Sequence, residues 1–419
     1  MRAEPVGGPL VTRSLLAPTA LVGVAGLLIF WRLFVGLGPT TALNDGYPLG
    51  LWIAFDVVTG TALACGGYAV AILVFILNRG RYHPLIRPAI LTSALGYSLA
   101  GFSVAIDIGR WWNIWKVPLF FWKWNFDSAL LEIALCIMAY VFVLWIELSP
   151  AFFEKFADSS ILWLRRLSRA ALPILERAAL FLIALGLLLP TMHQSSLGTL
   201  MLLAGPRLHP LWRTPMLPLL FLLGCVSMGY AVVVCESAFS AIAFKRRVDT
   251  DMLTRLGAVI VPIQVAAVAL RLGDWMVRDA WAGVAIGDAR SLMAISEVVL
   301  WLAPVPMLWS AARAGARRAG AERGEGAPAS DGAGVWGGAP RDYDLGGLVR
   351  AALVMLFAGA LFRFDTYLVA FTPGAHWSYF PSVTEILITV GLVAAEIVAY
   401  VVIVKTFPIL SGQREPVHV

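Results

Sequence analysis

Four side chains that can carry protons lie inside or at the ends of long apolar stretches of this sequence. They are Tyr97, Glu132, His193 and Glu236, with His193 in the run PTMHQSSLGTLM that follows an apolar segment. Carboxyl, phenol and imidazole groups pass protons along a chain when waters join them, so these residue types predict proton transfer. Buried polar groups also serve as hydrogen-bond anchors between helices, and this second interpretation stays open for each of them.

The positions of these residues along the apolar stretches predict an order of depth. At a helical rise of about 1.5 Å per residue, Glu236 lies low, Tyr97 in the middle and Glu132 higher up. His193 is expected at the mouth of the opposite side, where the serines after it cap a polar turn. Glu396, in the middle of the last stretch, is interpreted mainly as a structural residue.

Metal and haem binding are not predicted. A b-type haem held by two histidines needs both of them at membrane depth, facing each other. The apolar stretches contain no such pair among His83, His193, His209, His376 and His418. The cysteines form no CxxC motif and lie inside apolar stretches, as packing residues do; they are Cys65, Cys136, Cys225 and Cys235. We therefore expect no haem, no metal and no iron–sulfur cluster in this chain.

The composition explains why polar groups at these positions matter. Of 419 residues, 59% are hydrophobic and only 14% are charged, which leaves too little polar surface for a soluble protein. Apolar runs of about 20 residues recur along the whole chain, each long enough to cross a lipid bilayer as a helix. A β-barrel would show short alternating segments instead. The sequence therefore predicts an all-α polytopic membrane protein.

Ten transmembrane helices are predicted. They cover residues 14–38, 51–77, 86–108, 127–148, 176–192, 216–244, 253–273, 291–314, 346–366 and 382–407. The first run is too long for a signal peptide and is expected to remain as a helix. Most of the 32 Lys and Arg residues fall on the side of the N-terminus, so the positive-inside rule places both termini in the cytoplasm. We expect a bacterial inner (cytoplasmic) membrane and, because topology accounts for the basic residues, no nucleic-acid partner.

The chain is predicted to have three parts. Residues 1–313 hold the first eight helices, residues 314–345 form a flexible cytoplasmic linker, and residues 346–419 hold the last two helices and a cytoplasmic tail. The loops on the outer side are dense in aromatic residues, above all between Trp111 and Trp124. This density predicts a folded outer surface that receives a partner protein. Asp107 and Arg110, just before that loop, are expected to form an interfacial ion pair.

Several stretches of the chain resemble a known family. They are NDGYPLGLWIAFD (44–56), ACGGYA (64–69), NRGRYHPLIRPA (78–89), GYSLAGFSVAIDIGRWWN (96–113), LPTMHQSSLGTLM (189–201), HPLW (209–212) and YFPSVTEILI (379–388). Together they are similar to the HybB-type membrane subunits of menaquinone-reactive nickel–iron hydrogenases. Those subunits are a branch of the NrfD/polysulfide-reductase family of membrane anchors. The resemblance is weakest in the linker.

The resemblance implies a fold, a reaction and partners. The fold is two four-helix bundles with peripheral helices at the ends of the chain. The reaction is electron transfer, without haem in this subunit, between menaquinone near the periplasmic face and a ferredoxin-like iron–sulfur subunit docked there. That subunit links to the large and small subunits of a nickel–iron hydrogenase.

The resemblance also implies the site residues. The positions implicated in proton transfer match Tyr97, Glu132, His193 and Glu236, the four residues that depth singles out. The quinone is expected at the outer ends of the first bundle, near Asn44, Asp45, Asp107, Arg110 and His193. Donors there would meet the quinone carbonyls, and an apolar slot would hold its tail.

Two alternatives stay open. The first is the membrane quinone anchor of a different outer-facing oxidoreductase, such as a polysulfide reductase or a multihaem cytochrome module. The second is a proton-coupled transporter, since ten helices with buried carboxylates would suit one. Transporters usually have internal repeats and helices broken at mid-membrane, and only Pro262 lies deep within a span here. The sequence therefore favours the quinone-reactive subunit.

Overall fold

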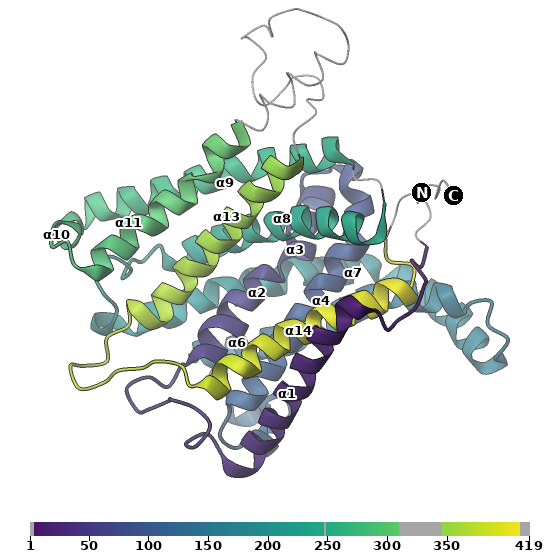
Figure 1. The fold of residues 1–419 in the computed structure, drawn as a ribbon, viewed down its shortest axis with the longest axis horizontal. Coiled ribbons are helices and arrows are strands. Elements are labelled where there is room, and N and C mark those ends of the chain that lie inside the picture. Colours follow the sequence, from purple (N-terminus) through teal and green to yellow (C-terminus); the bar gives the residue numbers. More distant parts are fainter. Residues whose placement is uncertain (1–3, 247–248, 310–344, 411–419) are drawn as a thin grey trace, which may run out of the picture.

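The computed structural model describes residues 4–246, 249–309 and 345–410, and it is built from helices (Figure 1). Within these ranges ten helical segments are long and apolar enough to cross a membrane. They are Arg13–Val35, Trp52–Ile76, Gly80–Asp107, Ala129–Phe156, Leu162–Leu203, Leu217–Phe244, Met252–Val277, Ala289–Trp309, Leu345–Val369 and Val383–Thr406. No strand is assigned in the described ranges beyond isolated bridge residues such as Leu208 and Phe371. The predicted all-α fold with ten membrane helices is thus confirmed.

Several spans change helix type along their length. The spans comprise α1 (Arg13–Val35); η1 (Trp52–Thr59), α2 (Gly60–Leu63), α3 (Gly66–Ala71) and η2 (Ile72–Ile76); η3 (Gly80–Leu85) and α4 (Ile86–Asp107); α6 (Ala129–Phe156); α7 (Leu162–Leu203); α8 (Leu217–Phe244); α9 (Thr250–Val277); α11 (Ala289–Leu302); α13 (Leu345–Phe364) and η7 (Asp365–Val369); and α14 (Val383–Thr406). Short helices α5 (Lys116–Leu119) and α10 (Trp281–Ala285) lie in the connections. The segments η1, η2 and η7 are π-helical, a form that often marks functional positions because its wider turn disturbs the normal hydrogen-bond ladder.

The two ends of the described chain lie close together (Figure 1). The backbone N–H of Val6 donates to the carbonyl of Val404 at 3.1 Å, and that of Gly7 to Lys405 at 3.0 Å. We call this end of the molecule the terminal end. The opposite end carries the loops 36–50, 108–128 and 370–382, and we call it the aromatic end. Which end faces the cytoplasm stays a prediction from the basic residues.

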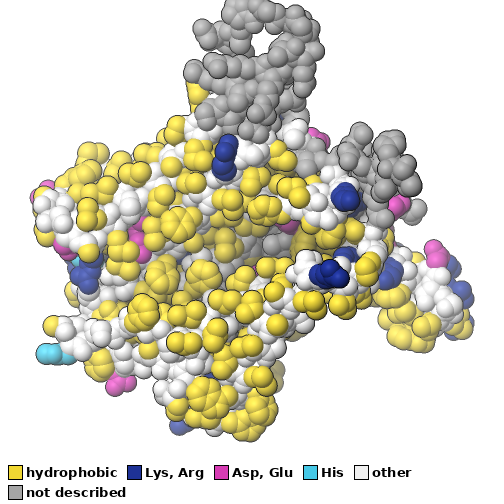
Figure 2. Space-filling model, viewed as in Figure 1, with side chains coloured by type: hydrophobic (Ala, Val, Ile, Leu, Met, Phe, Trp, Pro, Cys, Tyr) yellow, Lys and Arg dark blue, Asp and Glu magenta, His cyan; other side chains and the backbone are white. Residues whose placement is uncertain are grey.

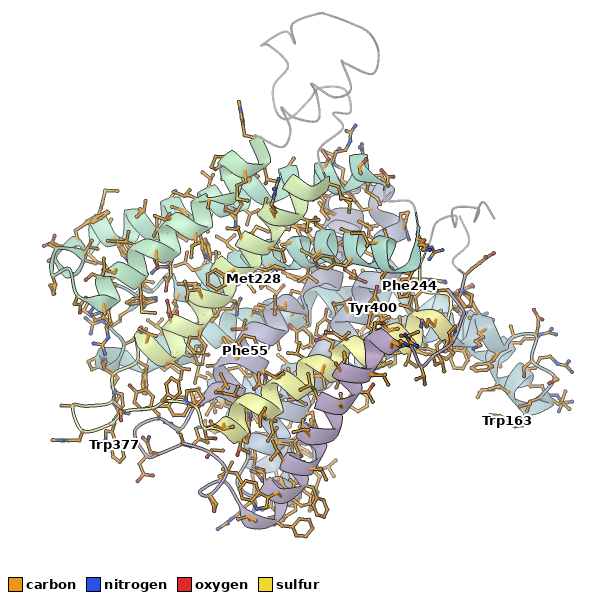
Figure 3. All side chains as sticks on the ribbon, in the orientation of Figure 1. Phe55, Trp163, Met228, Phe244, Trp377 and Tyr400 are labelled. Carbon is orange, nitrogen blue, oxygen red and sulfur yellow. The ribbon has the colours of Figure 1, made fainter. Side chains whose placement is uncertain are left out.

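Helix α8 lies at the centre of the packing. It contacts α3 and α7 on one side and α9 and α13 on the other, while α6 packs against α4 and α7. Cys225, Met228 and Tyr230 of α8 are fully buried, and Figure 3 shows Met228 near the middle of the molecule. The finer expectation of two four-helix bundles stays a prediction.

The first and last spans form a pair on the outside of the molecule (Figure 1). They approach so closely that a Cβ atom on Gly391 would lie 2.1 Å from Cβ of Ala25, so only glycine fits at this crossing. The other face of α1 is exposed and apolar, as Leu27, Phe30 and Phe34 illustrate. Figure 2 shows that hydrophobic side chains cover most of this side of the molecule, as expected for a surface in contact with lipid.

Helix α7 is much longer than the sequence predicted. It has 42 residues, or about 63 Å at 1.5 Å per residue, where residues 176–192 were predicted as a span. Its first part forms a hairpin with the end of α6 that protrudes from the terminal end, where Figure 3 shows Trp163 at the tip. Pro173 and Pro190 lie inside the helix without ending it. The predicted linker 314–345 lies outside the described residues except for Leu345, which begins α13.

Candidate functional site

His193 lies inside α7, and the predicted polar turn at this position is wrong. The helix continues ten residues past His193, to Leu203, because the hydroxyls that follow are satisfied within the helix. Ser195 donates to the carbonyl of Thr191 at 2.9 Å, and Ser196 donates to that of Met192 at 2.8 Å. The imidazole is fully buried instead of lying at an outer mouth. His193 therefore lies in the buried interior between the helices.

His193 and Tyr97 meet in a buried hydrogen-bond network. The Gln194 amide donates to the Thr61 hydroxyl at 3.0 Å and to the Tyr97 hydroxyl at 3.3 Å. The ring of Tyr97 packs edge-on against His193, with centroids 5.7 Å apart, and the Cys65 thiol lies 3.5 Å from the Tyr97 oxygen. Tyr97 and His193 thus lie side by side instead of one above the other.

The hydrogen bonds of Thr61 define how His193 can act. The Thr61 hydroxyl donates its only proton to the carbonyl of Val57 at 2.7 Å, so it can only accept from other partners. His193 Nε2 lies 3.2 Å from the Thr61 oxygen and must therefore carry the hydrogen of the neutral ring. That leaves Nδ1 as an acceptor, and Nδ1 is buried without a hydrogen-bond partner, like Oε1 of Gln194. A buried base with an unused acceptor atom can take a proton from a bound molecule or water.

A buried arginine supports the same region. Arg363 of α13 is 1% exposed and donates to the carbonyls of Val58, at 3.1 Å, and Phe221, at 2.7 Å. Val58 belongs to the π-helical η1, whose altered ladder makes its carbonyl available. The guanidinium also lies over the Phe221 ring at 4.6 Å. No carboxylate within the described ranges forms an ion pair with Arg363, so its positive charge is held by carbonyl dipoles and a ring face.

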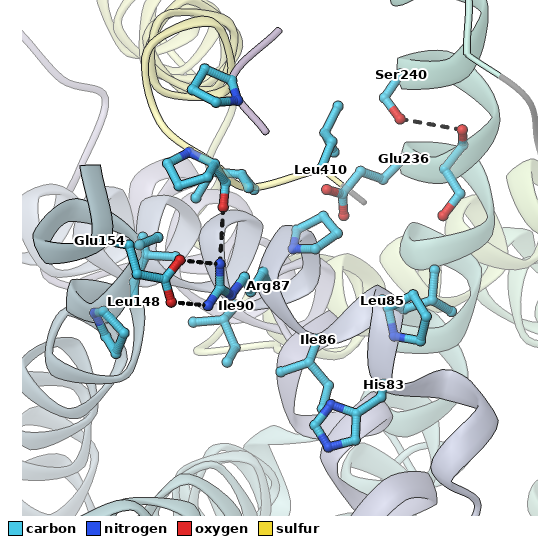
Figure 4. Close-up of a pocket in the computed structure, with 18 of the residues that line it drawn as sticks. His83, Leu85, Ile86, Arg87, Ile90, Leu148, Glu154, Glu236, Ser240 and Leu410 are labelled. Carbon is cyan, nitrogen blue, oxygen red and sulfur yellow. Dashed lines mark hydrogen bonds and ion pairs between the residues drawn. The ribbon is translucent and has the colours of Figure 1, made fainter. Parts of the chain in front are cut away.

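Glu236 lies at the terminal end, next to a large cavity. The Tyr400 hydroxyl donates to Oε1 of Glu236 at 2.7 Å. The cavity has a volume of about 1490 Å³, and Figure 4 shows Glu236 beside Leu410 and opposite the Arg87–Glu154 ion pair. Glu147 of α6 lines the same cavity and was missed from the sequence, although a carboxyl in an apolar run was the available signal. This cavity can bring water to two half-buried carboxyl groups.

Glu132 is not part of the network. It lies near the start of α6 at the aromatic end, half-buried, and its side chain makes no hydrogen bond or ion pair with another described residue. A titratable neighbour is Cys136, one turn further along the helix. The structure therefore separates Glu132 from Tyr97 and His193, and its predicted role in proton transfer stays a prediction.

The predicted quinone residues have different surroundings. Asn44 organises its own loop, since Oδ1 accepts from the backbone of Tyr47 at 3.0 Å and Nδ2 donates to the carbonyl of Ser378 at 3.0 Å. Asp45 and Arg110 are exposed at the aromatic end. Only Asp107 and His193 of this set have buried polar atoms without a hydrogen-bond partner. These two offer the free hydrogen-bonding capacity that a buried ligand would need.

The expected ion pair between Asp107 and Arg110 is wrong. The charged groups nearest Asp107 are Arg32 of α1 and Glu385 of α14, not the exposed Arg110. Arg32 is 1% exposed and donates through Nη2 to the carbonyl of Ile108 at 2.8 Å, which places its charge at the end of α4. The sequence analysis used the basic residues only to orient the helices and so missed the proximity of Arg32 to Asp107.

A carboxylate clamps the loops beside Asp107. Glu385 accepts from the backbone N–H of Ala42 at 2.8 Å and from the Tyr379 hydroxyl at 2.6 Å, and the hydroxyl accepts from Leu51 N–H at 2.7 Å. Burial and the adjacent Glu385 raise the pKa of Tyr379 well above its ordinary value, so it remains a donor at all physiological pH values. The loop 42–51 is thereby fixed to the start of α14.

Comparisons with known proteins identify the class. Residues 41–309 match the model of the polysulphide reductase NrfD family, so this chain, a multi-pass integral membrane protein, belongs to that family. The chain is 37% identical over 420 residues, covering 99% of it and 97% of the relative, to the "Probable Ni/Fe-hydrogenase 2 b-type cytochrome subunit" of Escherichia coli (strain K12). It is 28% identical over 266 residues, covering 61% of it and 60% of the relative, to the "Menaquinone reductase, integral membrane subunit" of Nitratidesulfovibrio vulgaris.

The first of these names contradicts the expectation that the chain carries no haem. A b-type cytochrome is a haem protein, and the relative with that name matches nearly the whole chain, so the prediction from histidine positions is corrected. The described residues do not supply two facing buried histidines, since His193 is buried while His83 and His376 are exposed and His209 lies in a loop. They do not fit a bis-histidine haem, and no step below is routed through one.

Proposed function

We propose that this chain is the quinone-reactive membrane subunit of a nickel–iron hydrogenase complex. Hydrogen is oxidised by the large and small subunits, and electrons reach menaquinone in this chain through a ferredoxin-like iron–sulfur subunit docked on the aromatic end. The quinone takes up two electrons and two protons and becomes the quinol. The full-length similarity to a hydrogenase membrane subunit and the partial similarity to a menaquinone reductase membrane subunit support this reaction.

The observation that carries the proposal is the unpartnered Nδ1 of His193. Protonation of a reduced quinone needs a group that can hold a proton within hydrogen-bonding reach of the headgroup. His193 has such an atom beside a hydrogen-bond network of Thr61, Gln194 and Tyr97, in which Oε1 of Gln194 is the other buried atom without a partner. We assign His193 and Tyr97 as the residues nearest the reacting oxygens. Asp107 and Arg32 lie at the entrance, with Asn44, Asp45 and Arg110 around its outer rim.

Protons reach this network from the terminal end in our proposal. The cavity supplies water to Glu236, and Tyr400 and Glu396 continue the polar path from there into the helices. Because the cavity lies at the start of α4 and Asp107 at its end, the cavity is about 30 Å from the predicted quinone entrance. It therefore fits a proton inlet and not the quinone site. Glu132 keeps its predicted role in proton transfer in this proposal, as a carboxyl group near the aromatic end.

A substitution of His193 tests the proposal. In His193→Gln the amide nitrogen can take the place of Nε2 against Thr61, but the basic Nδ1 atom is lost. We expect hydrogen-dependent menaquinone reduction by the assembled complex to fall by about 10² or more, as for a lost general acid–base. Reduction of an artificial dye by the hydrogenase subunits should stay unchanged, since it does not use this chain.

Two controls make the result specific. His376→Gln removes an exposed histidine at the aromatic end and should leave both activities unchanged. His193→Asn keeps an acceptor near the position of Nδ1 but no base, and should be as inactive as His193→Gln. Wild-type quinone reduction in both His193 variants would rule out the assigned role.

A second candidate, the membrane anchor of a different NrfD-type oxidoreductase, is favoured by the menaquinone reductase relative. Polysulfide reductase-like or multihaem cytochrome partners would then replace the hydrogenase. Purification of the complex through a tag on this chain decides between the two, because the co-purifying subunits differ. Copurification of hydrogenase large and small subunits supports the first proposal, and their absence beside another catalytic subunit supports the second.

A further inference from the structure

A second buried polar cluster lies between α9, α11 and η7, and it is absent from the sequence analysis. Its members are Arg271, Glu297 and Asp365, which are 6%, 0% and 0% exposed. Arg271 Nη1 pairs with Glu297 Oε2 at 2.5 Å, and Trp212 Nε1 donates to Glu297 Oε1 at 3.1 Å. The Asp365 carboxyl lies within hydrogen-bonding reach of the Glu297 carboxyl. The two acids are thus adjacent, with one arginine beside them.

The cluster has unused polar atoms. Both carboxyl oxygens of Asp365 are buried and have no donor, and Nη2 of Arg271 is buried and has no acceptor. The Arg271 guanidinium is held in place from three sides by rings, those of Trp212, Trp275 and Phe362, whose centroids are 5.8, 5.1 and 5.0 Å away. Such rings fix the position of the charge and exclude lipid and bulk water. A buried carboxyl group with neither oxygen satisfied needs a bound proton, a water or a cation.

The charge balance selects a proton. Two carboxylates and one guanidinium would leave one net negative charge inside a membrane-spanning protein, which is costly in a low dielectric. Two adjacent carboxyl groups lower this cost by sharing one proton, which also provides the donor that Asp365 lacks. A metal cation is disfavoured because Arg271 already places a positive charge beside both acids.

Other charged groups do not change this balance. Arg363 is two residues before Asp365, so it projects about 200° away around the helix, and it is occupied by the carbonyls of Val58 and Phe221. The Tyr367 hydroxyl points to the carbonyl of Leu197 at 2.8 Å. Among the described residues, Arg271 of α9 and Glu297 of α11 are the charged groups that act on the Asp365 carboxyl. Arg290 of α11 also reaches η7, but it donates to the backbone carbonyl of Val369 at 3.2 Å.

We propose that Glu297 and Asp365 form a second buried proton-binding site, in which the two carboxyl groups hold one proton beside Arg271. The site lies near the aromatic end, since Asp365 is four residues from the end of its span at Val369. Asp365 comes from a segment outside residues 41–309, the part of the chain that the family model matches. The proposal does not depend on the quinone reaction.

Infrared spectroscopy of the purified complex tests the proposal. At about pH 7, exposed carboxyl groups with pKa values near 4 are ionised, so a protonated-acid C=O band reports buried carboxylic acids. We expect Asp365→Asn to remove one such band, because the amide donates to Glu297 in place of the shared proton. Asp365→Glu should keep a shifted band, and Glu154→Gln, a half-exposed cavity-rim carboxylate paired with Arg87, should change nothing.

Two outcomes would overturn the proposal. One is a band unaffected by Asp365→Asn, which means that the pair is fully ionised. The other is a thermal stabilisation by Na⁺ that Asp365→Asn abolishes, which means that a cation occupies the site. If the variants fail to assemble, the wild-type complex still tests the proposal, because the absence of any protonated-acid C=O band at about pH 7 would overturn it.

Discussion

The two buried polar regions of this protein compensate in different ways for the free-energy cost of placing polar groups in a membrane. Around His193 the groups are mostly neutral, and each shares hydrogen bonds with Thr61, Gln194 or Tyr97. Around Arg271 they are formally charged and are compensated by an ion pair and by aromatic rings. A neutral network can pass a proton along its hydrogen bonds and carries an extra charge only while the proton is there, whereas a charged cluster is sensitive to the loss of any member. The neutral network around His193 thus suits repeated proton transfer during turnover, and the charged cluster around Arg271 suits the storage of one proton.

The two regions are joined by a single helix. Arg363 on α13 supports the His193 region, and Asp365, just beyond it in η7, belongs to the Arg271 cluster. The charge of Arg363 has no anionic partner within the described residues, while Arg271 pairs with Glu297. Substitutions that remove charges should therefore act very differently in the two regions.

The largest expected effect is on Arg271. Arg271→Met leaves Glu297 buried without its counter-ion and should lower the stability by about 3–5 kcal/mol, seen as a large drop in the melting temperature of the purified protein. The double substitution Arg271→Met with Glu297→Met removes both charges and should recover most of the loss. A double variant as unstable as the single one would show that the cluster is not held by this ion pair.

A smaller effect is expected in the His193 region. Tyr97→Phe removes one acceptor of the Gln194 amide, which keeps its bond to Thr61. The cost to stability should be about 1 kcal/mol, measurable as a small shift of the same melting transition. If the hydroxyl relays protons, quinone reduction per folded complex should fall strongly despite this small loss of stability. An activity loss no larger than the loss of folded protein would mean that Tyr97 only packs.

The smallest effect is expected for His209, which lies in the same loop as Trp212, the residue that donates to Glu297 of the Arg271 cluster. Burial and nearby Arg290 lower the pKa of His209, so the folded protein holds this ring neutral more strongly than the unfolded chain does. Stability should therefore decline as the pH falls below about 6.5, the ordinary value, and level off below the lowered pKa. Melting temperatures measured across this range should show a dependence that His209→Gln removes. The exposed His376→Gln variant should keep it.

The sequence predicted the spans well because each is a long apolar run, and helix formation in a membrane follows from length and composition. It failed at α7, where HQSS looked like an end. The hydroxyls of Ser195 and Ser196 bond back into the helix, which no local pattern announces. The sequence analysis singled out His193 as a polar residue beside an apolar run, but it predicted a position at the outer mouth, whereas the side chain is fully buried.

The tertiary partners could not be predicted from one sequence. Asp107 faces Arg32, and Asp365 meets Glu297 and Arg271, and all of these contacts join spans distant along the chain. Arginines inside apolar runs were the available signal, because a buried charge in a membrane protein needs a partner. The sequence analysis used the basic residues only to orient the helices, and so it gave no partners to Arg32, Arg271 and Arg363. The haem expectation is contradicted on a different ground, the b-type cytochrome name of a relative that matches nearly the whole chain.

The most direct test of the central claim is the side from which protons are taken. The complex is reconstituted in liposomes with the terminal end facing a trapped pH indicator, and menaquinone is reduced with hydrogen. We predict proton consumption on the side of the cavity, loss of this consumption in Glu236→Gln, and normal consumption in Glu154→Gln at the cavity rim. Protons drawn only from the side of the aromatic end, with Glu236→Gln behaving as wild type, would contradict the account.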